Sequence, residues 1–352
     1  MDIAARAAEI EQARTLPRDI VEWLIEDGVF RLCVPKAIGG LQAEPSELVE
    51  RIAAIAEADG STGWCAMIGA TSGLAAAYLP EAAAQAIYGP RTVVGGVFAP
   101  RGKAVPAEGG FRISGRWPFA SGCRHCDWLM VGALVGPEVQ LFLLPAAEVT
   151  IHDTWHVAGL AGTGSNDIEV ADRFVPVEHS FSLTSGTPWA EGRIYAFPAF
   201  GLLALGIAAV AVGIAAGAIG DFKHIATKWT PTLGRRSLAE RGQIQAVLAE
   251  ATGQVEAARA YLHRAIERAE APLTVEARAR VRLAAIHATR AAAEAVTRLH
   301  QHAGGGSLYL DSPLQRRFRD VHAATQHMMV GPATLELVGR LQFGLDTDTA
   351  ML

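Results

Sequence analysis

The chain has 352 residues, half of them hydrophobic, and a formal net charge of −5. This length and apolar content predict a large core divided between two or three closely packed units. Because no block of like charge stands out, nucleic acid is excluded as an expected partner. The polar start of the chain has no apolar signal segment, so we expect a cytoplasmic protein in which the four cysteines stay reduced.

Residues 1–90 have the periodicity of an N-terminal helical domain. A first apolar stripe ends at Asp59, where an Asp-Gly pair signals a turn. The next helix is predicted over residues 63–79, because Ser61 or Thr62 can cap its start and a proline follows its end.

Residues 91–184 change to the pattern of a β domain. Short alternating apolar runs surround a Gly-Gly pair at 109–110, which is typical of strands joined by a turn. Two further apolar runs, 128–135 and 139–144, are separated by a Gly-Pro pair. This spacing predicts a β-hairpin.

Residues 185–352 return to helical spacing. Two apolar stripes are separated by Pro272, and a glycine-rich break at 302–313 precedes a last helix that starts near Leu314. Long helices with short connections predict an antiparallel four-helix bundle.

Residues 194–220 carry no charge, and their length alone would allow a membrane span. The segment is mostly alanine and glycine, and no second span accompanies it. A helix that is apolar on all sides can instead form the buried centre of a soluble bundle. We favour the buried helix and expect no membrane association.

Four longer stretches, 58–67, 109–128, 154–176 and 302–327, resemble signatures of the flavin monooxygenase branch of the acyl-CoA dehydrogenase superfamily. That branch includes para-hydroxyphenylacetate hydroxylases, a secosteroid hydroxylase and dibenzothiophene monooxygenase. The resemblance implies an α+β protein with the acyl-CoA dehydrogenase fold: an N-terminal helical domain, a central β-barrel-like domain and a C-terminal four-helix bundle. It also implies a homotetramer.

An acyl-CoA dehydrogenase needs a carboxylate base that reaches the α-proton of its thioester substrate. In most members this glutamate lies nine residues after the arginine of an Arg-Asp pair, which resembles Arg319-Asp320 here. The chain has Met328 at that position and no acid in 198–207, where other members place the base. It has instead His327, eight residues after the arginine, as the monooxygenase branch often does.

In the branch that the chain resembles, a separate flavin reductase supplies reduced flavin, which reacts with O2 to give a C4a-hydroperoxyflavin. That species oxygenates a small aromatic or heterocyclic substrate. The resemblance gives Ser121 the role of the residue near flavin N5, and His327 that of a catalytic histidine, for which a pKa near neutral is suited. The alternative for His327 is a histidine that caps or fills the bundle.

Trp117 and Phe119 match positions that line the flavin ring, although both could equally belong to the core of the β domain. Ser165 could bond the flavin or could equally cap a loop. For these three residues both interpretations stay open.

Gly304 and Gly305 match the loop through which flavin phosphate or adenylate approaches the backbone. Arg319 either attracts the flavin phosphate or lies at a bundle surface or subunit contact. An arginine that holds the pyrophosphate in acyl-CoA dehydrogenases would lie four residues before Gly234, where the chain has Thr230. This departure favours FMN, with FAD as the alternative.

The substrate pocket is expected to include Thr71, Ser72, Val97 and Met328. Relatives that hydroxylate phenols have a histidine near the first two of these positions. The pocket is therefore expected to be less polar, which leaves heterocycle, sulfur or nitrogen oxidation open beside ring hydroxylation. We expect no metal site, because a lone Cys-x-x-C pair at 123–126 is weak evidence for zinc.

Two other functions remain open from the sequence. One is an acyl-CoA dehydrogenase-like oxidoreductase with a non-standard base, and the other is a non-catalytic flavin-binding homologue. Retention of both Ser121 and His327 favours the monooxygenase.

Overall fold

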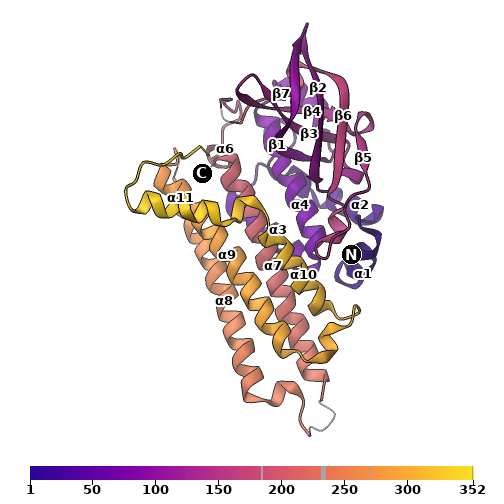
Figure 1. Cartoon of the computed structure of the whole chain (residues 1–352), viewed down its shortest axis with the longest axis vertical. Helices are drawn as coiled ribbons and strands as arrows, with labels where there is room; N and C mark the ends of the chain where they lie inside the picture. The colour runs from indigo at the N-terminus through magenta and orange to yellow at the C-terminus, as the bar shows by residue number, and fades with distance from the viewer. Residues whose placement is uncertain (184, 231–234, 271, 351) are drawn as a thin grey trace.

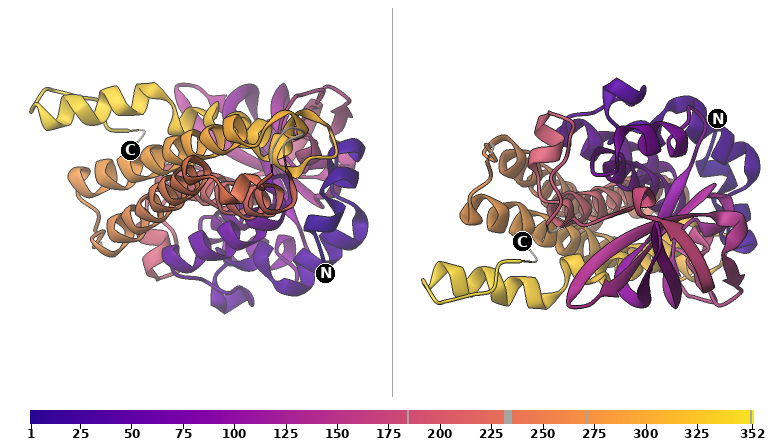
Figure 2. Two further views of the ribbon diagram at one scale, coloured as in Figure 1. Left: turned by 90° about the horizontal axis from the view of Figure 1, so that it is seen from below. Right: turned by 90° about the horizontal axis from the view of Figure 1, so that it is seen from above.

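The computed structural model describes residues 1–183, 185–230, 235–270, 272–350 and 352. Short N-terminal helices and a twisted sheet occupy one end of the molecule, and long C-terminal helices extend from them (Figure 1). The N-terminal helices and helices α9 and α10 lie on opposite sides of the central helix α7 (Figure 2).

The N-terminal part contains α1 (Ala7–Ala13), α2 (Arg18–Asp27), α3 (Pro45–Ala58), α4 (Gly60–Ser72) and α5 (Glu81–Ile87). Helix α4 begins earlier than predicted, because the buried carboxylate of Asp59 is its N-cap and accepts a hydrogen bond of 2.7 Å from the backbone of Thr62. It also ends earlier, since the chain tightens into a 3-10 helix over Gly73–Ala77. The prediction of one helix over 63–79 with Ser61 or Thr62 as its cap was therefore wrong.

The central sheet has seven strands: β1 (Val94–Ala107), β2 (Gly110–Ala120), β3 (Trp128–Val135), β4 (Glu138–Pro145), β5 (Thr150–His152), β6 (Asn166–Pro176) and β7 (Ser180–Phe181). Their order is β5-β6-β2-β1-β3-β4-β7. Among the described residues the predicted central β domain is one seven-stranded sheet with β5 and β7 at its edges. The predicted hairpin is confirmed as β3–β4, in which Val135 pairs with Glu138.

The C-terminal part contains α6 (Arg193–Ala196), α7 (Ala199–Lys228), α8 (Gly242–Glu267), α9 (Val275–His302), α10 (Pro313–Thr325) and α11 (Pro332–Gln342). Helices α7 to α10 form the predicted bundle. The helix expected near Leu314 starts at Pro313, whose fixed φ suits a first helical position. It is not the last helix, since α11 follows a 3-10 turn at Met328–Val330 and packs on α9.

Helix α7 confirms the prediction of a buried central helix. It is long and apolar enough to span a membrane, yet 94% of its most apolar 18-residue stretch is buried inside the molecule. Glycines let its neighbours approach closely. A Cβ at Gly213 would lie 2.3 Å from the carbonyl oxygen of Ala53 on α3, and one at Gly206 would lie 2.6 Å from Met67 on α4.

Replacing Gly213 by alanine is expected to lower the free energy of unfolding by about 1–3 kcal/mol, because the added methyl group meets the backbone of α3. Gly220 in the same helix is the matched control. It is exposed and has no atom within 4 Å of an added Cβ, so Gly220→Ala should stabilise the protein by up to about 1 kcal/mol. Urea unfolding of both variants measures the difference. Equal effects would contradict the close packing of α7 on α3.

Candidate active site

A hydrogen bond joins the N-terminal helices to the sheet at the predicted flavin site. The indole Nε1 of Trp64, on α4, donates to Oγ of Ser121 at 3.0 Å. Ser121 directly follows β2, and its exposed fraction is only 5%. The next residue, Gly122, has φ 72° and donates its N–H to the carbonyl oxygen of Thr163 at 2.8 Å, which fixes the turn. Ser121 is therefore held rigidly between two elements.

A row of buried hydroxyl groups continues from Ser121 into the loop before β6. Ser121 Oγ lies 2.7 Å from Ser165 Oγ, and Ser165 Oγ lies 2.7 Å from Thr163 Oγ1. Thr163 in turn donates to the carbonyl oxygen of Leu160 at 2.7 Å. The structure thus brings Ser121 and Ser165 together, as expected for residues of one site.

The same loop is bonded to the helical bundle. Asp320, on α10, is buried and accepts a hydrogen bond of 2.6 Å from the backbone N–H of Leu160. Burial, with the nearby charge of Asp59, raises the pKa of Asp320 to about 7. Asp320 therefore ties α10 to the loop that carries Thr163 and Ser165.

His327 lies just after α10 and caps the 3-10 turn that follows. Its Nδ1 accepts a hydrogen bond of 3.2 Å from the backbone N–H of Met329, so this nitrogen carries no proton. Arg282, buried on α9, holds the turn by donating to the carbonyl oxygen of Met329 at 3.0 Å. Burial and the positive charge of Arg282 lower the pKa of His327 to about 4, below the near-neutral pKa expected from the sequence. At neutral pH the imidazole is neutral, with its proton on Nε2.

Trp64 brings the two predicted catalytic residues to one place. Its ring centroid lies 5.8 Å from that of His327, and its Nε1 bonds to Ser121. The N-terminal helices, the sheet and the C-terminal helices each contribute one of these three side chains. None of the three segments forms this cluster alone.

Phe119 and Trp117, predicted together, have different surroundings. Phe119 is 66% exposed and has φ 68°, a conformation that is strained for a bulky side chain. Its ring meets Trp155 edge to face at 6.1 Å. Trp117 is completely buried and donates to the carbonyl oxygen of Gly132 at 2.7 Å. The structure therefore favours the core interpretation for Trp117 and leaves the face of Phe119 available to a ligand.

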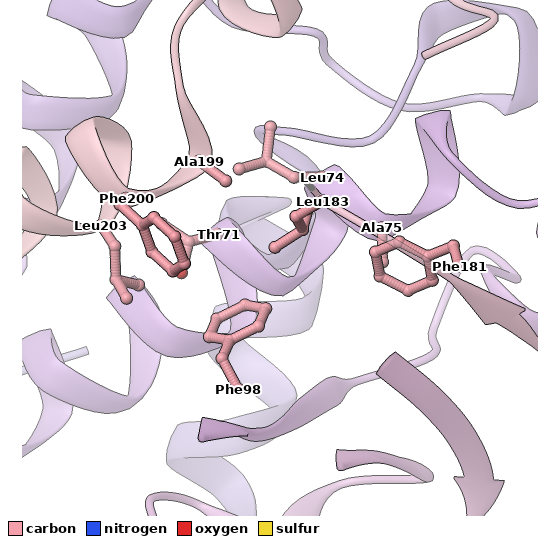
Figure 3. A pocket seen from close by; sticks show the side chains of 9 residues that line it. All are labelled: Thr71, Leu74, Ala75, Phe98, Phe181, Leu183, Ala199, Phe200 and Leu203. Carbon is pink, nitrogen blue, oxygen red and sulfur yellow. The ribbon is translucent and has the colours of Figure 1, made fainter. Parts of the chain in front are cut away.

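An apolar pocket lies beside α4 (Figure 3). Its free volume is about 10 Å³, room for about one water molecule. Thr71 lines it as predicted, but its hydroxyl donates to the carbonyl oxygen of Met67 at 2.8 Å. The other lining side chains are all apolar: Leu74, Ala75, Phe98, Phe181, Leu183, Ala199, Phe200 and Leu203.

Three other predicted pocket residues do not line this space. Ser72 is buried with an exposed fraction of 2%, and its carbonyl oxygen accepts from the hydroxyl of Tyr88. Val97 packs against the core of the sheet; β1 bulges between Val97 and Pro100, and Phe98 lines the pocket instead. Met328 is 65% exposed and lines a separate open depression beside α9 and α10.

Arg319, Gly304 and Gly305, predicted to bind the flavin phosphate, lie in different surroundings. Arg319 pairs with Glu11 and donates to the carbonyl oxygen of Ala158 and to Gln315, so the structure favours an internal contact over a phosphate ligand. Gly304 has φ 80°, and Gly305 is exposed with open space around it. Gly234 lies outside the described residues.

Sequence reasoning missed Trp64, Thr163, Phe98 and Arg282. Trp64 and Thr163 lie inside stretches that carried the resemblance, so their place beside Ser121 was within reach. Phe98 and Arg282 gave no local signal, because a strand bulge and a long-range contact position them.

Comparison with known proteins identifies the family. Residues 1–87 match the family described as "Acyl-CoA dehydrogenase, N-terminal domain", and residues 205–332 match "Acyl-CoA dehydrogenase, C-terminal domain". Indole-3-acetate monooxygenase from Pseudomonas putida is 33% identical over 97% of this chain and 90% of its own length. The chain belongs to the flavin-dependent monooxygenases of the acyl-CoA dehydrogenase fold.

Other relatives agree with this membership. The oxygenase component of FADH(2)-dependent resorcinol hydroxylase from Rhizobium sp. is 32% identical over 97% of this chain and 91% of its own length. The crystal structure of 3-HSA hydroxylase from Rhodococcus sp. RHA1 superposes with a TM-score of 0.94 at 29% identity, covering 99% of this chain and 96% of that one. The chain is thus the oxygenase component of a flavin-dependent monooxygenase.

His327 is expected to stay neutral over the range in which ordinary histidines titrate. Its folded pKa of about 4 lies below the ordinary 6.5, so its contribution to stability is present above 6.5 and is lost as the pH falls toward 4. An NMR titration should show its ring signal, assigned by loss in His327→Gln, unchanged between about pH 8 and pH 5. A midpoint near 6.5 would contradict the buried, neutral imidazole.

Proposed function

We propose that this monooxygenase uses reduced flavin and O2 to oxygenate an uncharged aromatic or heterocyclic substrate, with Ser121 and His327 at the reacting ring. The observation that carries the proposal is the contact of both residues with Trp64. The absence of a carboxylate at 198–207 and at Met328 argues against thioester dehydrogenation.

The residues of the site fit a flavin ring. Ser121 opens the row of buried hydroxyls, and the exposed face of Phe119 offers an apolar surface for a flat ring. Gly305 is exposed with open space around it, so its backbone is open to a phosphate, whereas Gly304 lies against the ring of Trp229. The strained φ of Phe119 supports a functional role, because strained residues concentrate at such sites.

Reduced flavin, when bound, supplies the electrons that activate O2. The side chains of the chain hold and protect the reacting groups. Ser121 Oγ supports the edge of the ring, and the neutral His327 offers the proton on Nε2 to an oxygen that becomes negative. Trp64 and the buried hydroxyls keep water from this side of the site.

The pocket beside α4 supports an uncharged substrate. Thr71 lies seven residues after Trp64, so both share one face of α4 about 10 Å apart. None of the described residues that line the pocket is charged. The pocket has to open for a substrate, and Phe98, Phe200 and Leu203 are the side chains that would move. Indole-3-acetate monooxygenase, by its name, acts on a bicyclic heterocycle that also carries a carboxylate, so it supports the ring class here, while the proposal of an uncharged substrate rests on the lining of the pocket.

The flavin is proposed to be FMN or FAD, delivered by a separate flavin reductase. Thr230, in place of a pyrophosphate-binding arginine, supports FMN. The resorcinol hydroxylase relative and XiaF from Streptomyces sp., solved with FADH2 at 26% identity, support FAD. Anaerobic titration with each reduced flavin separates the two.

We also propose a cytoplasmic homotetramer. The four free cysteines support the cytoplasm, and the exposed apolar side chains of Leu308, Tyr309 and Leu310 support a subunit contact.

Replacing His327 by glutamine is expected to lower the rate of substrate oxygenation about 100-fold, because the site loses its proton donor. The variant should still consume O2 but should release it as hydrogen peroxide instead of transferring oxygen to the substrate. His224→Gln, at an exposed position on α7, is the control and should keep the wild-type rate. The measurement compares product with peroxide under a supply of reduced flavin. A normal yield in His327→Gln would overturn the catalytic role.

Replacing Thr71 by valine is expected to change KM by less than about twofold, because the hydroxyl already donates within α4 and gives nothing to a substrate. Leu203→Ala is the informative partner, since it enlarges the pocket and should admit bulkier apolar rings. A large rise in KM for Thr71→Val alone would show that a polar substrate group binds there.

A further inference from the structure

We infer that Thr163 and Ser165 are positioning residues that fix Ser121 as a hydrogen-bond acceptor, so that the site binds reduced flavin in preference to oxidised flavin. The inference rests on the proposed place of Ser121 beside flavin N5. It also rests on the direction of each hydrogen bond in the row of buried hydroxyl groups, since each hydroxyl has a single proton.

The Leu160 carbonyl oxygen, at one end of the row, can only accept hydrogen bonds. Thr163 Oγ1 lies 2.7 Å from it, so the single hydroxyl proton of Thr163 points there. Ser165 Oγ, 2.7 Å from Thr163 Oγ1, must then donate to Thr163. Ser165 has no second proton, so in the 2.7 Å contact with Ser121 the donor is Ser121.

The proton of Ser121 is therefore committed to Ser165. One of the two lone pairs of its oxygen accepts from Trp64 Nε1 at 3.0 Å. One lone pair remains, and it can only accept. Leu160 itself is fixed, because Asp320 holds its N–H at 2.6 Å. The polarity of the whole row is thus set from the bundle side.

Water has little access to reverse this order. The exposed fractions of Thr163, Ser165 and Ser121 are 1%, 3% and 5%. Reversal would remove the shortest hydrogen bond to the Leu160 carbonyl oxygen, 2.7 Å from Thr163 Oγ1, and leave that oxygen with the longer bonds from Trp155 Nε1 at 3.1 Å and from the backbone N–H of Thr163 at 3.2 Å.

This polarity distinguishes the two redox states of flavin. Reduced flavin carries a hydrogen on N5 and donates there, whereas oxidised flavin presents a lone pair at N5. If Ser121 can only accept, it forms a hydrogen bond with the N5–H of reduced flavin. With oxidised flavin its lone pair faces the lone pair of N5, which is unfavourable. An oxygenase that receives reduced flavin and must release the oxidised form benefits from this difference.

The experiment measures dissociation constants for reduced and oxidised flavin in three variants. In Ser165→Ala the proton of Ser121 is free to donate to oxidised N5. In Thr163→Val the proton of Ser165 is free to turn toward Ser121, with the same result. Both should lower the preference for reduced flavin by about three- to tenfold, mainly through tighter binding of the oxidised form. Thr163→Ser keeps the hydroxyl and should keep the wild-type ratio.

Thr252→Val is the matched control, because Thr252 also donates to a backbone carbonyl, that of Leu248, but lies on α8 away from the site. It should leave the ratio unchanged. An unchanged ratio in both Ser165→Ala and Thr163→Val, in proteins that still bind reduced flavin, would overturn the assignment while leaving the proposed function intact. A wild-type protein that binds neither redox form would contradict the proposed function itself.

Discussion

Close packing along α7 is the constraint on which the rest of the structure depends. Gly206 admits Met67 of α4, Gly213 admits the backbone of α3, and Gly217 admits Arg317 of α10. Because these approaches leave no room for a Cβ, the N-terminal helices and α10 are held at fixed positions around one buried helix. The position of α4 then determines where Trp64 meets the sheet.

The site is assembled by this packing rather than by any one segment. Trp64 comes from α4, Ser121 from the end of β2, and His327 from the turn after α10. Asp320 and Arg282 hold the two loops that carry the remaining groups, through hydrogen bonds to Leu160 and Met329. Reactive groups in such a site need little reorganisation, which is how a protein stabilises charge that forms during a reaction.

The sequence predicted the arrangement of helices, sheet and bundle, because helical and strand periodicities depend on local spacing. It also predicted Ser121, Ser165 and His327 through a resemblance, and the structure places Ser121 and Ser165 in contact. It did not separate Phe119 from Trp117, since exposure depends on which sheet face is covered. It predicted Met328 and Val97 for the substrate pocket, whereas neither lines the space beside α4, because a turn and a strand bulge, both set by distant contacts, position these side chains.

The central claim is that the cluster of Ser121, Trp64 and His327 supports oxygen activation by flavin. The most direct test mixes the anaerobic protein, loaded with reduced flavin, with oxygenated buffer and follows near-ultraviolet absorbance. The account predicts a long-lived absorbing species distinct from oxidised flavin, which decays faster in Ser121→Ala. Immediate appearance of oxidised flavin with free hydrogen peroxide, with or without candidate substrates, would contradict it.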